Sequence, residues 1–506
     1  MRHPEAQAVQ GLQNAGGNFS FAAMDTVQQQ HESSVPLVVD LDGTLVRTDT
    51  LHEGLASLVA QHPLLLFKLP SWLMRGRSGF KQEVAERSLL DPSLLPYDPD
   101  VLHLIAQARE RGRSVALVSA ADHRQVEAVA NHLQLFDLVV GTGTAANDAN
   151  LRGAAKADLL VQHFGHRGFD YIGDSATDLP VWTAAREAVG VRLAPATRRL
   201  AHAQGIPLVE IGQRTGWPLR AMIRACRPHQ WAKNLLIFLP VLTAFNLAAL
   251  PAAALAFLCF SFAASAVYIV NDLLDLPNDR RHPRKRFRPF ASGEATAAQG
   301  AVASAALLLL AFSLALLLPG PFLGMLLTYL VITTVYSLSL KRKMMADVIT
   351  LAVLYTLRIV AGSLATGIVL SPWLLVFSMF LFFSLATIKR QAELEDLTNR
   401  GKTETAGRNL LVSDLPIYRA MSISSAQAAV LVFALYTQDT SVQLQFSKPI
   451  ILLLICPILM LWLGRMQLMT TRGFMTDDPL VFTMRDRVSA TCGVVMLSFF
   501  LMAAAG

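Results

Sequence analysis

Residues 268–280 read YIVNDLLDLPNDR, and this stretch decides the fold class of the carboxyl-terminal half of the chain. It closes an apolar run over 252–270 that predicts a membrane-crossing helix. Asp272, Asp275 and Asp279 follow one another at helical spacings of three and four residues, which places their carboxylates on one face. Mg²⁺ prefers oxygen ligands and bridges to phosphates, so it could neutralise such a cluster. Although Pro277 disturbs the helix, we expect a magnesium site for a phosphorylated substrate here rather than solvated acids.

The sequence around that stretch is a series of long apolar runs. The chain has 506 residues, of which 53% are apolar and 16% charged, and its mean hydropathy is +0.41. The apolarity is confined to residues after Asn234, where runs approach the roughly 20 residues that a membrane helix needs. Nine runs qualify: 234–250, 252–270, 298–318, 321–340, 346–369, 373–388, 417–437, 449–465 and 488–505. Residues 234–506 are therefore predicted to form an all-α bundle of nine transmembrane helices.

Basic residues fix the expected orientation of this bundle. They gather in the loops after the second, fourth, sixth and eighth runs, and Lys448 is the exception. Residues 1–34 contain no apolar secretory segment and are predicted to be a disordered tail. By the positive-inside rule, the amino-terminal domain and the charged loops then face the cytoplasm of a bacterial-type inner membrane. A net charge of +7 placed at span ends favours lipid headgroups and phosphorylated substrates over nucleic acid.

Residues 213–233 connect the two parts of the chain. Within them, WPLRAMIRACR at 217–227 alternates apolar residues and arginines at helical spacing. This pattern suits either an amphipathic helix in the membrane interface or a plain linker helix.

Polar side chains accompany the carboxylates on the expected cytoplasmic side. A metal ion with lysines and arginines is the arrangement expected where a diphosphate departs. The candidates for substrate binding are Lys233, Asn234, Asn271, Arg284, Lys285, Arg288, Lys341, Arg358, Lys389, Arg390 and Glu393.

At these residues the chain resembles a known family. The motif at 271–279, closing the second helix of nine, is similar to the UbiA prenyltransferase superfamily, and within it to decaprenyl-phosphate phosphoribosyltransferases. The further matching stretches are RPHQWAKN (227–234), HPRKRFRP (282–289) with ASG (291–293), KRQAEL (389–394), and DDP (477–479) with RDR (485–487). Members that prenylate aromatic rings carry a second aspartate-rich motif after the sixth helix, where this chain has Lys389 and Glu393.

The resemblance implies a reaction without a protein nucleophile. An oxygen of a polyprenyl phosphate attacks C1 of phosphoribosyl pyrophosphate, and diphosphate leaves. Mg²⁺ held by Asp272 and Asp275, with Asp279, would stabilise the leaving charge. Two alternatives stay open: an aromatic polyprenyltransferase using polyprenyl diphosphate, and a transporter in which the aspartates relay ions. The sequence leaves the oligomeric state undefined.

Residues 35–212 have the pattern of a parallel α/β domain. Polar residues follow buried strands in VPLVVDLDGT (35–44), ALVSA (116–120) and FDYIGDSATD (169–178), and Lys156 lies between the last two. Because the carboxyl ends of parallel strands meet at one edge, these residues should form a site there. The helical residues 46–110 would form a cap over it.

The order of these motifs resembles phosphatases of the haloacid dehalogenase (HAD) superfamily. The resemblance implies that Asp40 attacks phosphorus and that Asp42 acts as the acid and base. Ser119 and Lys156 would hold the phosphoryl oxygens, and Asp40, Asp174 and Asp178 would bind Mg²⁺. A degenerate domain kept as a scaffold is the alternative. The hypothesis for its substrate is the phosphoribosyl lipid, from which it would remove the 5-phosphate.

Overall fold

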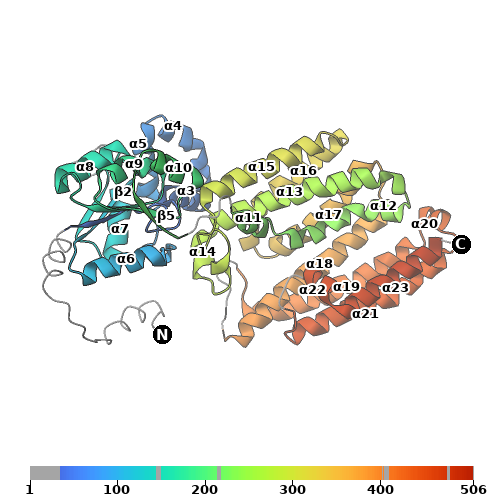
Figure 1. The fold of residues 1–506 in the computed structure, drawn as a ribbon. Helices are drawn as coiled ribbons and strands as arrows, with labels where there is room; N and C mark the ends of the chain where they lie inside the picture. Colours follow the sequence, from blue (N-terminus) through green and yellow to red (C-terminus); the bar gives the residue numbers. More distant parts are fainter. Residues whose placement is uncertain are drawn as a thin grey trace. The chain divides into compact units, whose positions relative to one another are not determined.

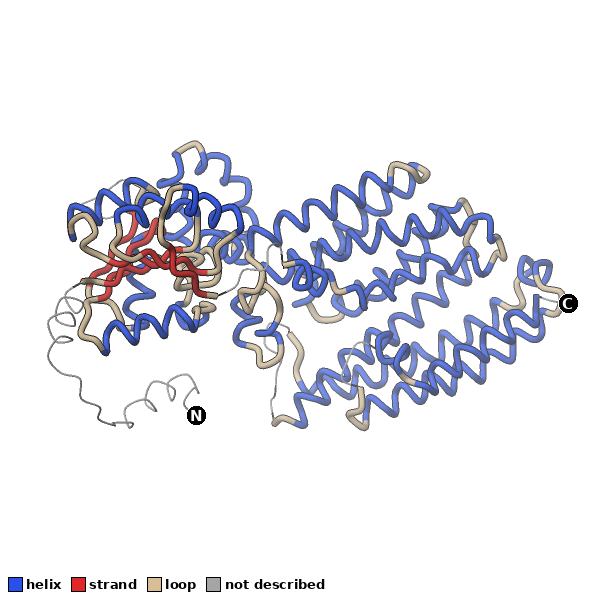
Figure 2. The backbone as a smooth tube through the Cα atoms, viewed as in Figure 1, coloured by secondary structure: helices blue, strands red, loops and turns tan. Residues whose placement is uncertain are grey.

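The computed structural model describes residues 35–143, 150–212, 218–401, 403, 409–475 and 479–504. The chain divides into two compact units, Met1–Trp217 (unit 1) and Pro218–Gly506 (unit 2), and all the strands lie in unit 1 (Figures 1 and 2). The predicted tail 1–34, residues 213–217 of the predicted linker and the DD pair at 477–478 lie outside the described residues.

Unit 1 is built on a parallel sheet, as the sequence predicted, and the structure shows that it has six strands. The strand order is β3-β2-β1-β4-β5-β6, and β1 is central. The strands are β1 (Leu37–Val39), β2 (Val115–Asp122), β3 (Leu138–Thr142), β4 (Asp170–Gly173), β5 (Ala188–Val191) and β6 (Leu208–Ile211). Val38 of β1 pairs with Ala116 of β2 and Tyr171 of β4. The strands that carry the polar motifs are therefore neighbours.

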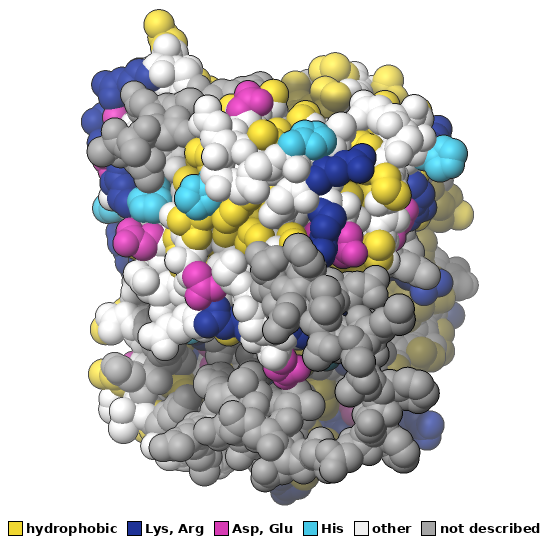
Figure 3. All heavy atoms as spheres, turned by 60° about the vertical axis from the view of Figure 1, so that its left-hand side comes forward, with side chains coloured by type: hydrophobic (Ala, Val, Ile, Leu, Met, Phe, Trp, Pro, Cys, Tyr) yellow, Lys and Arg dark blue, Asp and Glu magenta, His cyan; other side chains and the backbone are white. Residues whose placement is uncertain are grey.

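Helices cover both faces of this sheet. Leu37 and Val39 point to the face covered by α6 (Pro99–Glu110) and α7 (His123–Leu133). Val38 points to the opposite face, which α8 (Ala154–Phe164), α9 (Leu179–Ala184) and α10 (Pro195–Ala203) cover. This alternation along a short strand gives unit 1 two hydrophobic cores. Charged and apolar side chains mix on the face shown in Figure 3.

The predicted cap region is helical. Between β1 and α6 lie α3 (Thr50–Gln61), the 3₁₀ helix η2 (Pro63–Lys68), α4 (Leu69–Leu73), α5 (Gly76–Arg87) and the 3₁₀ turn η3 (Pro92–Leu94). The last predicted cap helix, α6, packs Val101 and Ile105 into the same core as Leu37. We therefore use the word cap for α3 to α5.

Unit 2 is entirely helical in its described part. Eight of its described helices are long and apolar enough to cross a membrane. They contain α13 (Leu250–Leu274), α15 (Ala297–Ala315), α16 (Gly320–Leu338), α17 (Ala346–Thr366), α18 (Pro372–Asn399), α19 (Leu415–Tyr436), α21 (Ile455–Thr471) and α23 (Arg487–Ala504). The shorter helices are α11 (Leu219–Cys226), α12 (Leu239–Thr243), α14 (Leu276–Arg281), α20 (Thr440–Gln445) and α22 (Pro479–Arg485). The 3₁₀ segments are η5 (Pro228–Phe238), η6 (Leu247–Ala249), η7 (Lys285–Phe287), η8 (Leu340–Arg342), η9 (Val412–Asp414) and η10 (Pro449–Leu454).

The first of the nine predicted spans, 234–250, is not among these eight, which corrects the prediction. The helical run is η5 followed directly by α12, and Phe245 then takes a left-handed backbone angle of φ 50° that ends it. At about 2.0 Å per 3₁₀ residue and about 1.5 Å per α residue, the run extends about 30 Å. It is short in residues but long enough for the hydrocarbon core of a bilayer.

This run lies antiparallel along α13. The indole of Trp231 donates to Ser265 Oγ at 2.9 Å, and the rings of Phe238 and Phe257 lie 5.8 Å apart further on. The run therefore passes from the carboxyl-terminal end of α13 toward its amino-terminal end. It overlaps residues 234–243 of the predicted first span.

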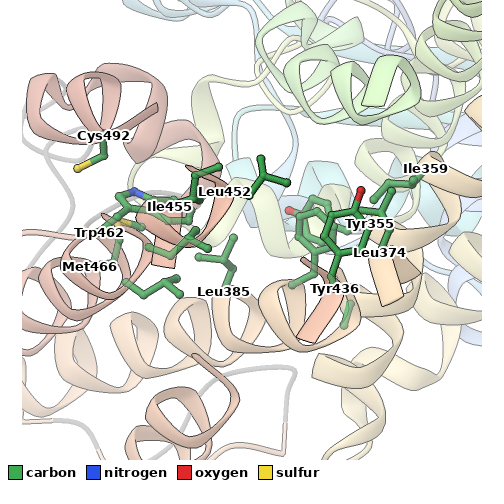
Figure 4. Close-up of a cluster of buried hydrophobic side chains, with 14 of the residues drawn as sticks. Tyr355, Ile359, Leu374, Leu385, Tyr436, Leu452, Ile455, Trp462, Met466 and Cys492 are labelled. Carbon is green, nitrogen blue, oxygen red and sulfur yellow. The ribbon is translucent and has the colours of Figure 1, made fainter. Parts of the chain in front are cut away.

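The hydrophobic core of unit 2 lies between the long helices. Figure 4 shows side chains from α17, α18, α19 and α21 meeting in one cluster, among them Tyr355, Leu385, Tyr436 and Trp462. The amphipathic helix α11 packs Met222 against α13, whereas Ile223 is exposed.

Candidate active sites

The acidic residues of unit 1 converge at the carboxyl edge of the sheet. Asp40 follows β1 and Asp174 follows β4, while Asp178 lies one turn later in the 3₁₀ turn η4 (Ala176–Asp178). One ligand oxygen from each carboxylate lies within 4.8 Å of the other two. The structure thus brings together the three predicted metal ligands of this unit. Three carboxylates form an oxygen-donor set that suits Mg²⁺.

Lys156 sits among these carboxylates. It is buried on α8, and its Nζ lies 3.0 Å from Asp40 Oδ2 and 3.8 Å from Asp178 Oδ1. The hydroxyl of Tyr171 accepts from Lys156 at 2.9 Å and donates to Asp178 Oδ1 at 2.8 Å. Burial raises the pKa of Asp40, and the positive charge of Lys156 opposes that rise. The lysine therefore offsets negative charge that would otherwise accumulate in a dry site.

Asp42 lies in the turn that follows β1. Its Oδ1 accepts from the backbone N–H of Thr50 at 2.8 Å. Burial, together with the nearby carboxylate of Asp49, raises the pKa of Asp42 to about 7. A carboxyl group with this pKa can donate or accept a proton near neutral pH, which is what a general acid and base requires.

Gly43 lets this turn approach the acidic cluster. Its φ is +75°, and a Cβ at this position would lie 2.3 Å from Asp174 Oδ2. A side chain here would strain the backbone and displace a predicted metal ligand.

The cap contributes a residue that the sequence analysis did not identify. Lys81 of α5 donates to the carbonyl oxygen of Ala120 at 2.6 Å and to Asn150 Oδ1 at 3.1 Å. Desolvation lowers its pKa. Its acceptor Ala120 follows Ser119, which is buried and accepts from the N–H of Ala121 at 3.2 Å. Lys81 therefore brings a positive charge from the cap to the ALVSA motif at 116–120.

In unit 2, the three aspartates of the deciding stretch pair with basic residues. Arg227 donates to Asp272 Oδ1 at 2.5 Å, and Arg288 donates to Asp272 at 3.1 Å and to Asp279 Oδ2 at 2.7 Å. Lys341 Nζ lies 3.6 Å from the carboxylate of Asp275. The site is therefore a network of alternating charges at the end of α13.

This arrangement differs from the predicted three-carboxylate metal site. Among the described residues, Asp40, Asp174 and Asp178 are the only group of three or more acidic, histidine or cysteine side chains close enough to share an ion. The carboxylates instead contact Arg227, Arg288 and Lys341, and α13 passes into α14 at Asp275, where i→i−4 hydrogen bonds continue on both sides.

Deeper in the bundle, Lys233, Asn234 and Arg358 meet. Arg358 Nε donates to Asn234 Oδ1 at 2.8 Å, and Asn234 Nδ2 donates to Ser261 Oγ at 3.0 Å. The ring of Tyr355 lies 5.6 Å from Lys233 Nζ and 5.6 Å from the Arg358 guanidinium carbon. The structure brings these three predicted binding residues to one place inside the bundle.

Arg390 occupies a third place, with a different environment. Its side chain is 0% exposed, and its guanidinium pairs with Asp347 through two nitrogens. It also donates to Glu393 Oε1 at 2.6 Å, and Tyr336 donates to Asp347 at 2.7 Å. These contacts indicate that Arg390 holds α18 against α17. A direct role in substrate binding has no support from this geometry.

The remaining predicted binding residues lie nearer the surface. Arg284 and Lys285 are exposed beside η7, and their backbone N–H groups donate to the ring of His282. Asn271 on α13 and Lys389 on α18 are half-buried.

Comparison with known proteins agrees with this division. The model of the UbiA prenyltransferase family matches residues 236–484, and that of haloacid dehalogenase-like hydrolases matches residues 37–182. A decaprenyl-phosphate phosphoribosyltransferase of Corynebacterium glutamicum is 35% identical over 228 residues, which cover 44% of this chain and 68% of that protein. The chain belongs to the UbiA prenyltransferase family. It is a UbiA protein with a HAD-like hydrolase domain fused ahead of the membrane helices.

Two further relatives show how the two units combine. The uncharacterized protein y4nM of Sinorhizobium fredii is 35% identical over 482 residues, 93% of this UbiA protein and 92% of that one. The nodulation protein NoeC of Azorhizobium caulinodans is also 35% identical, over 290 residues that cover 56% of this chain but 94% of NoeC. The complete two-unit arrangement is therefore matched in y4nM.

Proposed function

We propose that unit 2 transfers phosphoribose from phosphoribosyl pyrophosphate to a polyprenyl phosphate. The observation that carries this proposal is the cluster of basic side chains around Asp272, where Arg227 and Arg288 meet the end of an apolar bundle. Similarity to decaprenyl-phosphate phosphoribosyltransferases supports the choice of substrates. The presence of Lys389 and Glu393 where aromatic prenyltransferases carry a second aspartate motif also supports it.

The charges of the site suggest a division of roles. Arg227, Arg288 and Lys341 would bind the departing diphosphate, because guanidinium groups match phosphate oxygens in pairs. Lys233 and Arg358, inside the bundle, would hold the polyprenyl phosphate with its tail among apolar helices. The family resemblance implies Mg²⁺ at Asp272 and Asp275. That ion would stabilise the leaving diphosphate together with the three cations, which contact the same aspartates.

The transferase proposal can be tested in nanodiscs. Purified protein would receive polyprenyl phosphate with phosphoribosyl pyrophosphate, or prenyl diphosphate with an aromatic acid, and lipid products would be identified by mass spectrometry. We expect product from the first pair only, and a loss of at least about 100-fold in Arg288→Ala, which removes a charge stabiliser. Lys448→Met, in the loop between α20 and η10, is the control. Product from the aromatic pair alone would overturn the proposal.

For unit 1 we propose a Mg²⁺-dependent phosphatase that removes the 5-phosphate from the lipid product of unit 2. Asp40 would attack the phosphorus and Asp42 would protonate the leaving oxygen. The buried acidic cluster with Lys156 supports the chemistry. The fusion of two phosphate-handling units in one chain supports the choice of substrate.

The phosphatase is tested with the purified phosphoribosyl lipid. Wild-type protein should release inorganic phosphate, Asp40→Asn should release none, and the exposed α8 variant Asp158→Asn should behave as wild type. No release by wild type, or unchanged release by Asp40→Asn, would refute the phosphatase proposal for unit 1. The transferase proposal for unit 2 would be unaffected.

We also propose that the charged ends of the unit 2 helices face the cytoplasm of an inner membrane. The basic residues of the loops after α13, α16, α18 and α21 support this orientation. A reporter fused after Ala504 should lie outside the cytoplasm, and one inserted in the loop after α16 inside it. The reverse pattern would refute the orientation.

A further inference from the structure

Four large apolar side chains stand exposed on the cap of unit 1. They are Leu64 (79% exposed), Phe67 (84%), Leu73 (59%) and Met74 (88%), and together we call them the apolar cap patch. They come from η2, α4 and the residue that follows α4. Beside Leu64 lies an open hollow of about 510 Å³ lined by residues 61–65 and Arg87. Large apolar side chains exposed together on contacting elements such as η2 and α4 are typical of an interaction site.

A buried neighbour fixes the direction of two of these side chains, Leu73 and Met74. Trp72 of α4 is only 4% exposed, and the guanidinium of Arg87 on α5 lies 5.1 Å from its ring centroid. Because Trp72 holds α4 against α5, the neighbouring Leu73 and Met74 turn outward. The outward position of the patch is therefore part of the packed structure of the cap.

The charges around the patch select its partner. No Asp or Glu occurs from Gly54 to Gln82, and Lys68 and Arg75 are the basic residues next to members of the patch. Lys68 is exposed at the end of η2, next to Phe67. Arg75, which follows Met74, is paired with Glu83 at 2.5 Å, so Lys68 is the basic residue of the patch that is best placed to meet a phosphate. Exposed apolar side chains beside an exposed lysine are typical of surfaces that enter the interface of an anionic bilayer.

We propose that the apolar cap patch docks unit 1 on a bilayer containing anionic phospholipid. Phe67 and Met74 enter the headgroup region, and Lys68 contacts lipid phosphates. The fusion to a membrane unit in the same chain keeps unit 1 at a bilayer. Anionic lipid headgroups supply the negative charge that the exposed Lys68 attracts. The docking does not depend on which phosphate ester unit 1 hydrolyses.

Photo-crosslinking of the full chain tests this docking. The photoreactive p-benzoylphenylalanine would replace Phe67 or Met74 and, as controls on exposed apolar positions elsewhere in unit 1, Leu200 of α10 or Val209 of β6. Each variant would be irradiated in nanodiscs of phosphatidylcholine with phosphatidylglycerol, and in nanodiscs of phosphatidylcholine alone. Hydrogen-exchange protection of β4 would confirm that unit 1 is folded in every variant.

We expect phospholipid adducts at Phe67 and Met74 and none at the two controls. Adduct yield should fall several-fold when phosphatidylglycerol is omitted or when Lys68→Glu is added. Crosslinks to residues 218–506 or to a second chain, an absence of adducts, or equal adducts at the controls would overturn the docking. Equal yields in the two kinds of nanodisc would overturn the part assigned to anionic lipid.

Discussion

Replacing Lys156 by methionine should destabilise unit 1 in a way that the structure allows us to estimate. Lys156 Nζ lies 3.0 Å from Asp40 and 3.8 Å from Asp178. At an effective dielectric constant of about 20, these two attractions are about 5 and about 4 kcal/mol. The cost of burying the ammonium offsets part of that sum. Without the lysine, one of the carboxyl groups can take up a proton instead of staying charged. Protonating an aspartate with an ordinary pKa of about 3.9 costs about 4 kcal/mol at pH 7, and this limits the loss of unfolding free energy.

A loss of about 4 kcal/mol agrees with the usual cost of removing one member of a buried ion pair. For a unit of this size it should lower the unfolding temperature by about 8–16 °C. Hydrogen exchange of β1 and β4 during a thermal ramp in EDTA would follow unit 1 alone within the full chain. Added Mg²⁺ should recover part of the loss, because a bound ion supplies the missing positive charge.

A double-mutant cycle gives the control for Lys156→Met. In an Asp40→Asn background the cluster has one negative charge fewer, so the same substitution should cost clearly less. If Lys156→Met unfolds within about 2 °C of wild type, or costs as much in the Asp40→Asn background, the charge balance inferred for this site is wrong.

Three further predictions concern close contacts and buried charges. Gly43→Ala would place a methyl group against Asp174 and should weaken Mg²⁺ binding by at least about tenfold in titration calorimetry, whereas retained affinity would show that the turn can relax. Asp347→Ala would leave Arg390 buried without its main partner and should cost about 3–5 kcal/mol, seen as a lower aggregation temperature in detergent. Gly362→Ala would place a Cβ 2.0 Å from a backbone oxygen of η5 and should reduce transferase rate more than it reduces phosphate release from a soluble ester. Equal effects on both activities would contradict the assignment of η5 to the transferase site.

The sequence predicted the site of unit 1 better than that of unit 2. Asp40, Asp174 and Asp178 could be placed together because parallel strands end at one edge of a sheet, whatever the details of packing. Tyr171 and Lys81 escaped prediction for different reasons. Tyr171 reads as a buried strand residue, and Lys81 lies 39 residues from its acceptor Ala120, so only the packing of the cap brings the two together.

In unit 2 the spacing of the acidic residues indicated where the site lies, but it did not predict how the side chains of the site are arranged. The spacing of Asp272, Asp275 and Asp279 predicted a shared helix face, but it could not predict which basic side chains contact them. Basic residues from distant segments then fill the space between the carboxylates: Arg227 is 45 residues and Arg288 16 residues from Asp272. Sequence spacing describes one helix at a time, and such partners depend on how several segments pack.

The long 3₁₀ segment η5 affects where Lys233 and Asn234 lie along the bundle. Long 3₁₀ segments are uncommon, and each residue in one advances about a third further than in an α-helix. The run from Pro228 to Thr243 therefore crosses the bundle with almost no spare length. Deleting a single residue after Asn234 would shift the Asn234 side chain by roughly 2 Å along the axis of α13, away from its partner Ser261. The length of this segment thus determines where along α13 the side chain of Asn234, and with it the neighbouring Lys233, is held.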